Sequence, residues 1–373
     1  MAIPPIVLMI HGMGTHHQLD EENAEVQVAQ AEQDSDNGLT STQREVVTGI
    51  NETAKLFGIE GYKFEEKVEL REFNYSKYLH DVLMKDKQKA EALKDNIASL
   101  TGFGMGADLA NELISQLAGI SNDKFFYTHW MDIIYYGLTS HGEIIRNNLA
   151  RDLNKIISEA QPGQDIHIIA HSLGTAVLYD TITKWLKKDA NYSAENPELD
   201  VDNFKFKSIY MFANVSRLVN LLNDIGDPER SVLNSGPGGC SELFYNIFNE
   251  FDPFTWIKRW DGEILGNGYN KRVTTVRKLN THDLQEYVST PAACRWMMTN
   301  ITGDYIDLET LVKAKKQFEA HPDNLPQDLE NVEYEFSKVR SPSVGIGKIQ
   351  AIIKLFKSVH NAYDTAERLK EGF

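Results

Sequence analysis

One stretch in the middle of the chain constrains the fold more than any other. The apolar run 166–170 leads directly into His171-Ser172-Leu173-Gly174. Apolar residues then recur at helical spacing from Ala176 to Leu186. This change from a continuous apolar run to a helical period predicts a strand, a very tight turn and a helix, with Ser172 at the apex of the turn.

Such a turn suits a nucleophilic serine. It would hold Ser172 in a strained backbone conformation and lift its hydroxyl clear of the sheet. Ala170 and Gly174 are both small, as they must be where strand and helix nearly touch. The start of the helix would add N–H groups and a positive dipole end, which stabilise an oxyanion. An ordinary turn with a serine capping the helix has the same short pattern. Other parts of the chain must therefore decide between a nucleophile and a capping residue.

A second feature lies near the start of the sequence. Residues 6–10 (Ile-Val-Leu-Met-Ile) are continuously apolar, which predicts a fully buried strand. His11, Gly12, Met13 and Gly14 follow at once, and the two glycines would let the backbone come close to a ligand. A glycine-rich turn after any buried strand would look the same.

Together these two motifs resemble the α/β-hydrolase superfamily. Ala-x-Ser-x-Gly around Ser172 is similar to its nucleophile elbow, Gly-x-Ser-x-Gly, with only the first glycine replaced. A strand ending in His-Gly is similar to the loop that supplies one oxyanion-hole amide in that family. The resemblance implies that the amides of Met13 and Leu173 are the two donors.

The same resemblance implies that His11, Gly12 and Gly14 shape the oxyanion loop and that Gly174 supports the elbow. It covers roughly residues 5–300. The chain departs from the family pattern at Ala170, in lacking strands before residue 6, and in its long C-terminal part.

Candidate partners for the serine follow it in the sequence. A serine hydroxyl needs a base to take its proton, and the base needs a third group to orient it. In the hydrolase order both come later, at strand ends. Asp252 follows a predicted strand at 243–248, and His282 follows another at 272–279. The predicted triad is therefore Ser172, His282 and Asp252.

Other residues compete for these roles. Asp224 and Asp227 are alternative acids on the preceding loop. Asp283 adjoins the proposed base, and Asp304 follows it in the chain, so both are poorly placed. His171 is next to the serine in a strand, so we expect it to face the other way and to pack.

The remaining pattern predicts an α/β fold. Helical periodicity at 46–57 and 144–157 alternates with strands at 62–75 and 208–213, which indicates a mostly parallel central sheet flanked by helices. We expect an α/β-hydrolase domain over 1–300 with a helical insertion within it at 77–125. A helical C-terminal extension at 301–373, with one helix at 308–318, is expected to pack on that domain.

Two apolar segments have two interpretations each. Residues 97–120 carry few charges and are either a packed helical insertion or a lid over the site. The basic amphipathic helix at 347–369 either docks on the protein or lies on a lipid surface.

Composition excludes several classes. Over 373 residues, 38 Lys+Arg against 54 Asp+Glu give a net charge of −16, which argues against nucleic-acid binding and against adhesion to anionic membranes. No apolar stretch is long enough to span a bilayer, and no signal-peptide pattern opens the chain, so we expect a cytoplasmic protein, with export lacking a cleaved signal left open. Cys240 and Cys294 are expected to be reduced and buried.

These observations favour a serine hydrolase that cleaves carboxylic esters, lipase- or esterase-like, through an acyl-enzyme on Ser172. The substrate would be an ester, with transient contact at a lipid interface where that ester is a lipid. No cofactor is implied, and the spacing of His11, His16 and His17 does not support a metal. A thioesterase or amidase with the same triad, or a non-catalytic module binding lipid or protein, are the alternatives.

Overall fold

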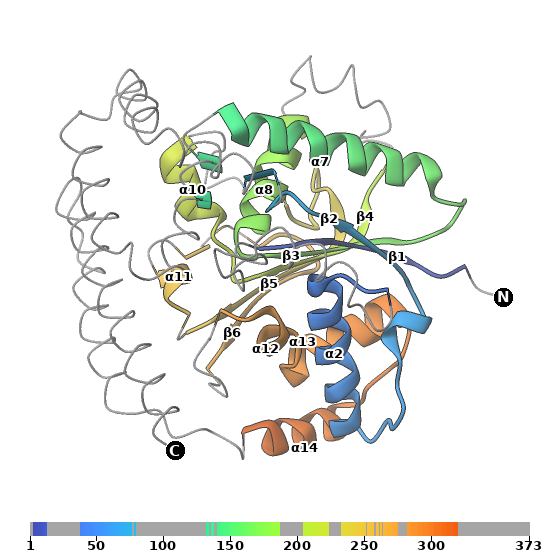
Figure 1. The fold of residues 1–373 in the computed structure, drawn as a ribbon. Coiled ribbons are helices and arrows are strands. Elements are labelled where there is room, and N and C mark those ends of the chain that lie inside the picture. The colour runs from blue at the N-terminus through green and yellow to red at the C-terminus, as the bar shows by residue number, and fades with distance from the viewer. Residues whose placement is uncertain are drawn as a thin grey trace, which may run out of the picture.

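A parallel six-stranded sheet forms the centre of the protein (Figure 1). The computed structural model describes residues 3–12, 38–76, 140–186, 204–223, 233–250, 264–274 and 282–319, with short pieces at 78–79, 132–133, 136–137, 252–256, 259–260 and 262. The strands are β1 (Ile6–Ile10), β2 (Glu69–Phe73), β3 (Ile166–His171), β4 (Phe206–Phe212), β5 (Ser241–Asn249) and β6 (Gly268–Val273). Their order is β2-β1-β3-β4-β5-β6, and every pairing is parallel. The predicted α/β class is therefore confirmed.

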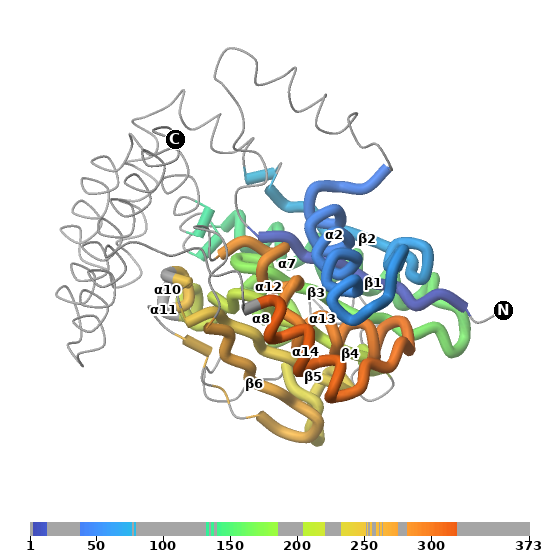
Figure 2. Tube along the Cα trace, turned by 90° about the horizontal axis from the view of Figure 1, so that it is seen from below, coloured from blue at the N-terminus to red at the C-terminus, as the bar shows by residue number. Residues whose placement is uncertain are grey.

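Helices cover both faces of the sheet. One layer contains α7 (Ser140–Glu159), α8 (Leu173–Leu186) and α10 (Ser216–Asn223). The other contains α2 (Ser41–Leu56), α12 (Leu284–Val288), α13 (Pro291–Met297) and α14 (Leu308–Glu319), which lie over the sheet in Figure 2. Three short helices complete the described elements: η1 (Phe64–Glu66), α11 (Pro253–Trp256) and η3 (Met298–Thr302).

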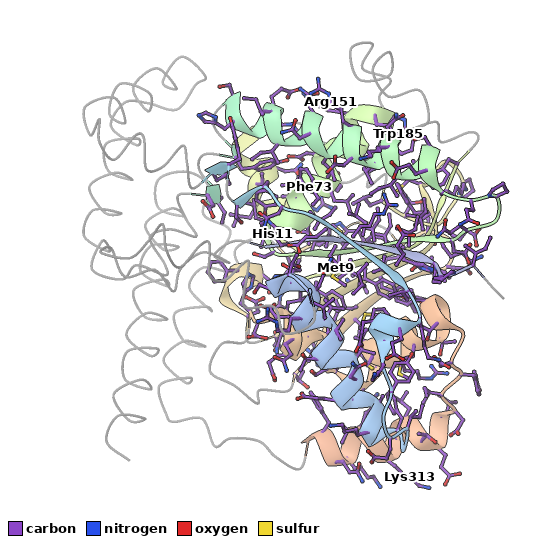
Figure 3. All side chains as sticks on the ribbon, turned by 45° about the vertical axis from the view of Figure 1, so that its right-hand side comes forward. Met9, His11, Phe73, Arg151, Trp185 and Lys313 are labelled. Atoms are coloured by element: carbon purple, nitrogen blue, oxygen red, sulfur yellow. The ribbon has the colours of Figure 1, made fainter. Side chains whose placement is uncertain are left out.

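The strand β1 shows why its sequence is continuously apolar. Ile6, Leu8 and Ile10 pack into the core beneath α7 and α8, whereas Val7 and Met9 pack into the core beneath α2. Side chains fill the space on both sides of the sheet, with Phe73 and Trp185 in the first core and Met9 in the second (Figure 3). A strand buried on both faces needs apolar residues at successive positions, not at alternate ones.

The strand order places a topological switch between β1 and β3. From β1 the chain moves outward to the edge strand β2, and it then returns to β3 on the opposite side of β1. After β3 the strands follow in sequence to β6. Neighbouring connections leave β1 and β3 in opposite directions, and open α/β sheets bind ligands beyond the carboxyl ends of strands at such a switch.

The last strand differs from its prediction. We predicted a strand at 272–279, but β6 pairs with β5 from Gly268 to Val273, and residues 275–281 lie outside the described part. The paired segment is Gly-Tyr-Asn-Lys-Arg-Val, and only Val273 in it is buried. An edge strand with so few buried residues has a weak hydrophobic pattern. The β-branched residues 273–276 favour a strand more strongly, so the prediction was centred on them.

Two other predictions are refined. The strand expected at 62–75 is shorter, because η1 occupies 64–66 and only Glu69–Phe73 pairs with β1. The predicted helix at 308–318 is α14, which packs through Leu311, Ala314 and Phe318 into the core beneath α2. Apart from residues 78 and 79, the insertion predicted at 77–125 lies outside the described residues, as does the extension from residue 320 onward.

No helix in the described ranges has both the length and the apolar character needed to cross a bilayer. Both cysteines, Cys240 and Cys294, are buried and free, as expected. Burial raises the pKa of the Cys240 thiol to about 12 and also raises that of Cys294, so neither is prepared for nucleophilic chemistry.

Candidate active site

The turn between β3 and α8 holds Ser172 in an unusual backbone conformation. Its φ is 52°, in the left-handed region that residues other than glycine rarely adopt. The Ser172 amide donates to the carbonyl of Phe212 at 3.0 Å, which ties the turn to the end of β4. The Thr175 hydroxyl donates to the Ser172 carbonyl at 2.6 Å and accepts from the Val215 amide at 3.1 Å. The end of β4, Val215 in the loop after it and the first turn of α8 thus fix the turn.

Two glycines allow the backbone segments around this turn to approach closely. A Cβ on Gly174 would lie 2.3 Å from the His11 carbonyl oxygen and 2.5 Å from that of Ile10. A Cβ on Gly12 would lie 2.7 Å from both His171 Nδ1 and Ser172 Cβ. The sequence predicted the requirement for a small residue at 174, but the segment that approaches it is the end of β1, not the strand leading into the turn.

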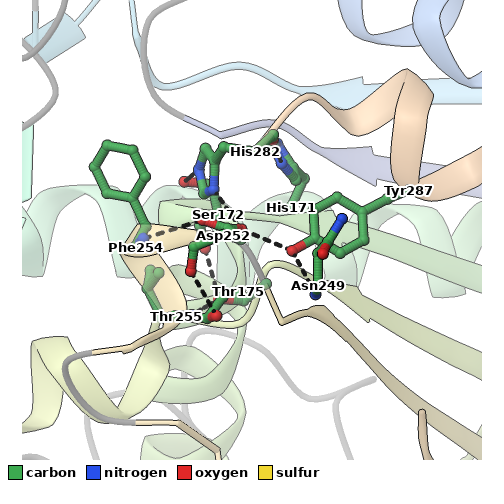
Figure 4. A network of polar contacts seen from close by, with 10 residues as sticks. His171, Ser172, Thr175, Asn249, Asp252, Phe254, Thr255, His282 and Tyr287 are labelled. Carbon is green, nitrogen blue, oxygen red and sulfur yellow. Dashed lines mark hydrogen bonds and ion pairs between the residues drawn. The ribbon is translucent and has the colours of Figure 1, made fainter. Parts of the chain in front are cut away.

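A serine, a histidine and an aspartate meet at the carboxyl edge of the sheet (Figure 4). The distance from Ser172 Oγ to His282 Nε2 is 2.7 Å, and that from His282 Nδ1 to Asp252 Oδ2 is 2.8 Å. Ser172 and Asp252 are fully buried, and His282 is 6% exposed. The structure therefore brings together the three residues that the sequence placed 110 and 30 positions apart.

Asp252 is held by donors from two elements. Its Oδ1 accepts from the Phe254 amide at 3.0 Å, within the short helix α11. Its Oδ2 accepts from His282 Nδ1 and also from the hydroxyl of Tyr287, which lies 2.7 Å away on α12. A carboxylate surrounded by three donors is held in one rotamer as an acceptor.

His282 is held in place through its own main chain. His282 lies just before α12, and Asp283 caps that helix by accepting from the Glu286 amide at 3.1 Å. His171 Nε2 lies 2.8 Å from the His282 carbonyl, and since a carbonyl only accepts, this nitrogen of His171 carries a proton. The ring of Phe254 packs against the imidazole with 4.4 Å between centroids.

His11 connects the loop after β1 to the loop after β2. Its Nε2 accepts from the Tyr75 amide at 3.1 Å, and its Nδ1 donates to the Gly12 carbonyl. The Tyr75 hydroxyl donates to the His11 carbonyl at 3.1 Å, and the two rings stack at 4.4 Å. Burial lowers the pKa of His11, so it remains neutral in this position.

Leu173 is the first residue of α8, at the positive end of its dipole. The first amides of a helix have no intrahelical acceptor, so this amide is available to an anion beside Ser172. The second predicted donor, Met13, lies outside the described residues together with Gly14. The alternative acids Asp224 and Asp227 are also outside them.

The other competitors lie elsewhere or act differently. Asp304 accepts from the Tyr62 hydroxyl at 2.7 Å and pairs with Lys67 at 3.0 Å, away from the serine. His171 was expected to face away from the serine and to pack; it does pack against the rings of His282 and Tyr287, but it also donates to the His282 carbonyl, which the sequence did not predict. The His171 ring centroid lies 6.3 Å from that of Tyr287 on α12.

Sequence reasoning missed two residues of this cluster, Tyr287 and Phe254. Tyr287 reaches the site through the packing of α12, and no motif marks it. Phe254 follows the Asp-Pro pair, so its proximity to Asp252 could have been expected, but its contact with His282 could not. Within the described ranges, no three His, Cys, Asp or Glu side chains gather in an arrangement that could hold a metal ion.

Fold and site together define an α/β protein with a buried Ser-His-Asp hydrogen-bond chain beyond the carboxyl ends of its parallel strands. No known family model matches the sequence, and no curated protein matches it.

Proposed function

We propose that this protein is a serine hydrolase of the α/β-hydrolase type that cleaves carboxylic esters, in the manner of a lipase or esterase. The observation that carries the proposal is the continuous chain from Ser172 Oγ through His282 to Asp252, with distances of 2.7 and 2.8 Å. Both are hydrogen-bond distances, as nucleophile activation by a base requires.

The first half of the reaction forms an acyl-enzyme. His282 Nε2 takes the hydroxyl proton as Ser172 Oγ attacks the ester carbonyl, and the imidazolium that results is stabilised by Asp252. The negative charge on the former carbonyl oxygen is stabilised by the Leu173 amide at the start of α8. When the intermediate collapses, His282 gives its proton to the leaving alcohol.

The second half returns the enzyme to its resting state. His282 removes a proton from a water molecule, which attacks the acyl carbon, and Ser172 leaves with a proton from His282. The strained turn keeps the hydroxyl in one position throughout, so neither step requires the backbone to reorganise.

Labelling with a fluorophosphonate probe tests the chemistry directly, because this probe traps an activated serine. We expect the folded protein to be labelled at Ser172, and we expect Ser172→Ala to abolish labelling. Ser158→Ala is the matched control, since Ser158 is an exposed serine on α7 whose hydroxyl donates to the Lys155 carbonyl at 2.8 Å. Absence of labelling in folded wild-type protein would overturn the proposal.

Turnover then tests the substrate class. p-Nitrophenyl esters from acetate to palmitate, an acyl-coenzyme A thioester and an acyl p-nitroanilide are compared by kcat/KM. We expect the esters to be preferred, and we expect Ser172→Ala to reduce ester turnover by at least about 10⁴-fold. A labelled serine with a preference for the thioester or the anilide would instead indicate a thioesterase or an amidase.

A further inference from the structure

A tyrosine on α12 contacts the acid of the Ser-His-Asp chain. The Tyr287 hydroxyl lies 2.7 Å from Asp252 Oδ2, the same oxygen that accepts from His282 Nδ1. It also lies 2.9 Å from the amide nitrogen of Asn249, at the end of β5. The side chain is 1% exposed, and its ring packs beside those of Phe212 and His171. The hydroxyl therefore lies between a backbone donor and a carboxylate.

The direction of both hydrogen bonds follows from the groups involved. The Asn249 amide can only donate, so the tyrosine oxygen accepts there. The hydroxyl has one proton, and the carboxylate is the group that can accept it. Burial raises the pKa of Tyr287 well above its ordinary value, and the charge of Asp252 raises it further, so the proton is retained.

We propose that Tyr287 is a positioning residue that holds Asp252 Oδ2 toward His282, an inference that rests on the proposed hydrolase function. The Phe254 amide fixes Oδ1 and Tyr287 fixes Oδ2, so the carboxylate cannot rotate about Cβ–Cγ. His282 and Tyr287 both belong to the segment at α12, whereas Asn249 ends β5 and Asp252 lies in the loop after it. The hydroxyl thus locks the loop of the acid to the segment of the base.

Tyr287→Phe tests this role, because it removes the hydroxyl and keeps the ring that fills the core. We expect the rate of Ser172 phosphonylation and the kcat for an ester to fall about 10- to 100-fold, the scale of a lost hydrogen bond to a charged group, with KM unchanged. Tyr210→Phe is the matched control. Tyr210 is also fully buried and donates to a main-chain carbonyl, that of Trp296 at 3.2 Å, so its variant should keep the wild-type rate.

A double-mutant cycle separates positioning from a general loss of stability. If Tyr287 acts through Asp252, adding Tyr287→Phe to Asp252→Asn should lower the rate little further. A second reduction as large as in the wild-type background would overturn the inference. Rates are normalised to the folded fraction measured by urea denaturation, so that partial unfolding cannot imitate the effect.

The outcomes also distinguish this inference from the function on which it rests. Wild-type protein labelled at Ser172, with Tyr287→Phe labelled at the same rate, would overturn the positioning role alone. Folded wild-type protein that is not labelled would overturn the hydrolase proposal, and the inference with it. Slower labelling of Tyr287→Phe, together with a non-additive cycle, supports both.

Discussion

Ser172 adopts a backbone conformation that costs roughly 1–3 kcal/mol in a residue with a side chain. The turn keeps this conformation because its neighbours fix it. The Phe212 carbonyl accepts from the Ser172 amide, and Thr175 bonds the Ser172 carbonyl. At the scale of single residues, the position of the Ser172 hydroxyl therefore depends on the Phe212 main chain and on the Thr175 side chain.

Thr175→Val should reveal this dependence. The two side chains have similar shapes, but valine leaves the buried Val215 amide without the hydroxyl that accepts from it. The Ser172 carbonyl loses the hydroxyl and keeps the Thr175 amide, at 2.9 Å. We expect the free energy of unfolding to fall by about 1–3 kcal/mol, as when buried polar groups lose a partner, together with slower labelling of Ser172.

Thr181→Val on the same helix is the control. The Thr181 hydroxyl only donates to the Val177 carbonyl, a group that keeps its helical partner, so the loss should be smaller. Urea denaturation of both variants makes the comparison. Equal losses would show that the Thr175 bridge contributes nothing particular to the turn.

Two helices approach other elements through a glycine. In α8, Gly174 faces the carbonyl oxygens of Ile10 and His11 at the end of β1. In α2, Gly49 faces α12, where a Cβ would lie 3.0 Å from Val288 Cγ1 and 3.2 Å from the Gln285 carbonyl oxygen. The first contact positions the serine, and the second supports the segment that carries the base.

Alanine substitutions at the two glycines should have different effects. In a helix, alanine is favoured over glycine by about 1 kcal/mol. At Gly174 this gain is outweighed, because the Cβ would meet backbone oxygens at 2.3 and 2.5 Å, and overpacking of this kind costs roughly 1–3 kcal/mol or more. At Gly49 the nearest atom is a side-chain methyl that can shift, so gain and cost nearly cancel.

Thermal unfolding of Gly174→Ala and Gly49→Ala measures this difference. We expect a clear decrease in Tm for the first variant and a change within a few degrees for the second. Gly49→Ala should also keep its rate of Ser172 labelling. A Gly174→Ala protein as stable as wild type would show that β1 and α8 can separate without cost.

At the scale of the whole molecule, burial of the sheet on both faces makes stability depend on pH. His167 lies in β3, is fully buried, and its Nδ1 lies 2.6 Å from the Ser208 hydroxyl on β4. Burial, and to a lesser degree the charge of Lys207, lowers its pKa to about 3. Burial also lowers the pKa of His11. Burial therefore favours the neutral form of both histidines in the folded protein.

The free energy of unfolding should therefore fall below the ordinary histidine pKa. Between about pH 6.5 and 3 the unfolded chain binds a proton at residue 167 that the folded chain does not, so stability decreases as pH falls. From pH 6.5 to 5, His167 alone accounts for about 2 kcal/mol, at 1.36 kcal/mol per pH unit.

Urea denaturation at pH 7 and pH 5 tests this for wild type and for His167→Asn, whose amide can keep a hydrogen bond to Ser208. The variant should lose less stability between the two pH values than wild type. The same loss in both proteins would mean that His167 is not the group that titrates on unfolding.

The sequence by itself determined the central elements of the fold and the order in which Ser172, Asp252 and His282 follow one another in the chain. The strands β1 and β3 and the helices α2, α7, α8 and α14 lie where their patterns predicted, because each packs on a core and so carries a regular apolar period. Ser172 at the apex of a turn, and Asp252 and His282 after later strands, followed from local pattern, chain order and a family resemblance.

Tertiary structure decided what depends on contacts between distant segments. The bounds of β6 come from its pairing with β5, since an exposed edge strand buries too little surface to show in a pattern. Tyr287 reaches Asp252, and His171 reaches the His282 main chain, because α12 packs beneath the sheet edge. A hydrogen bond spans only about 3 Å, so a side chain bonds whichever residue the fold brings beside it. No local sequence period predicts which distant segment that is.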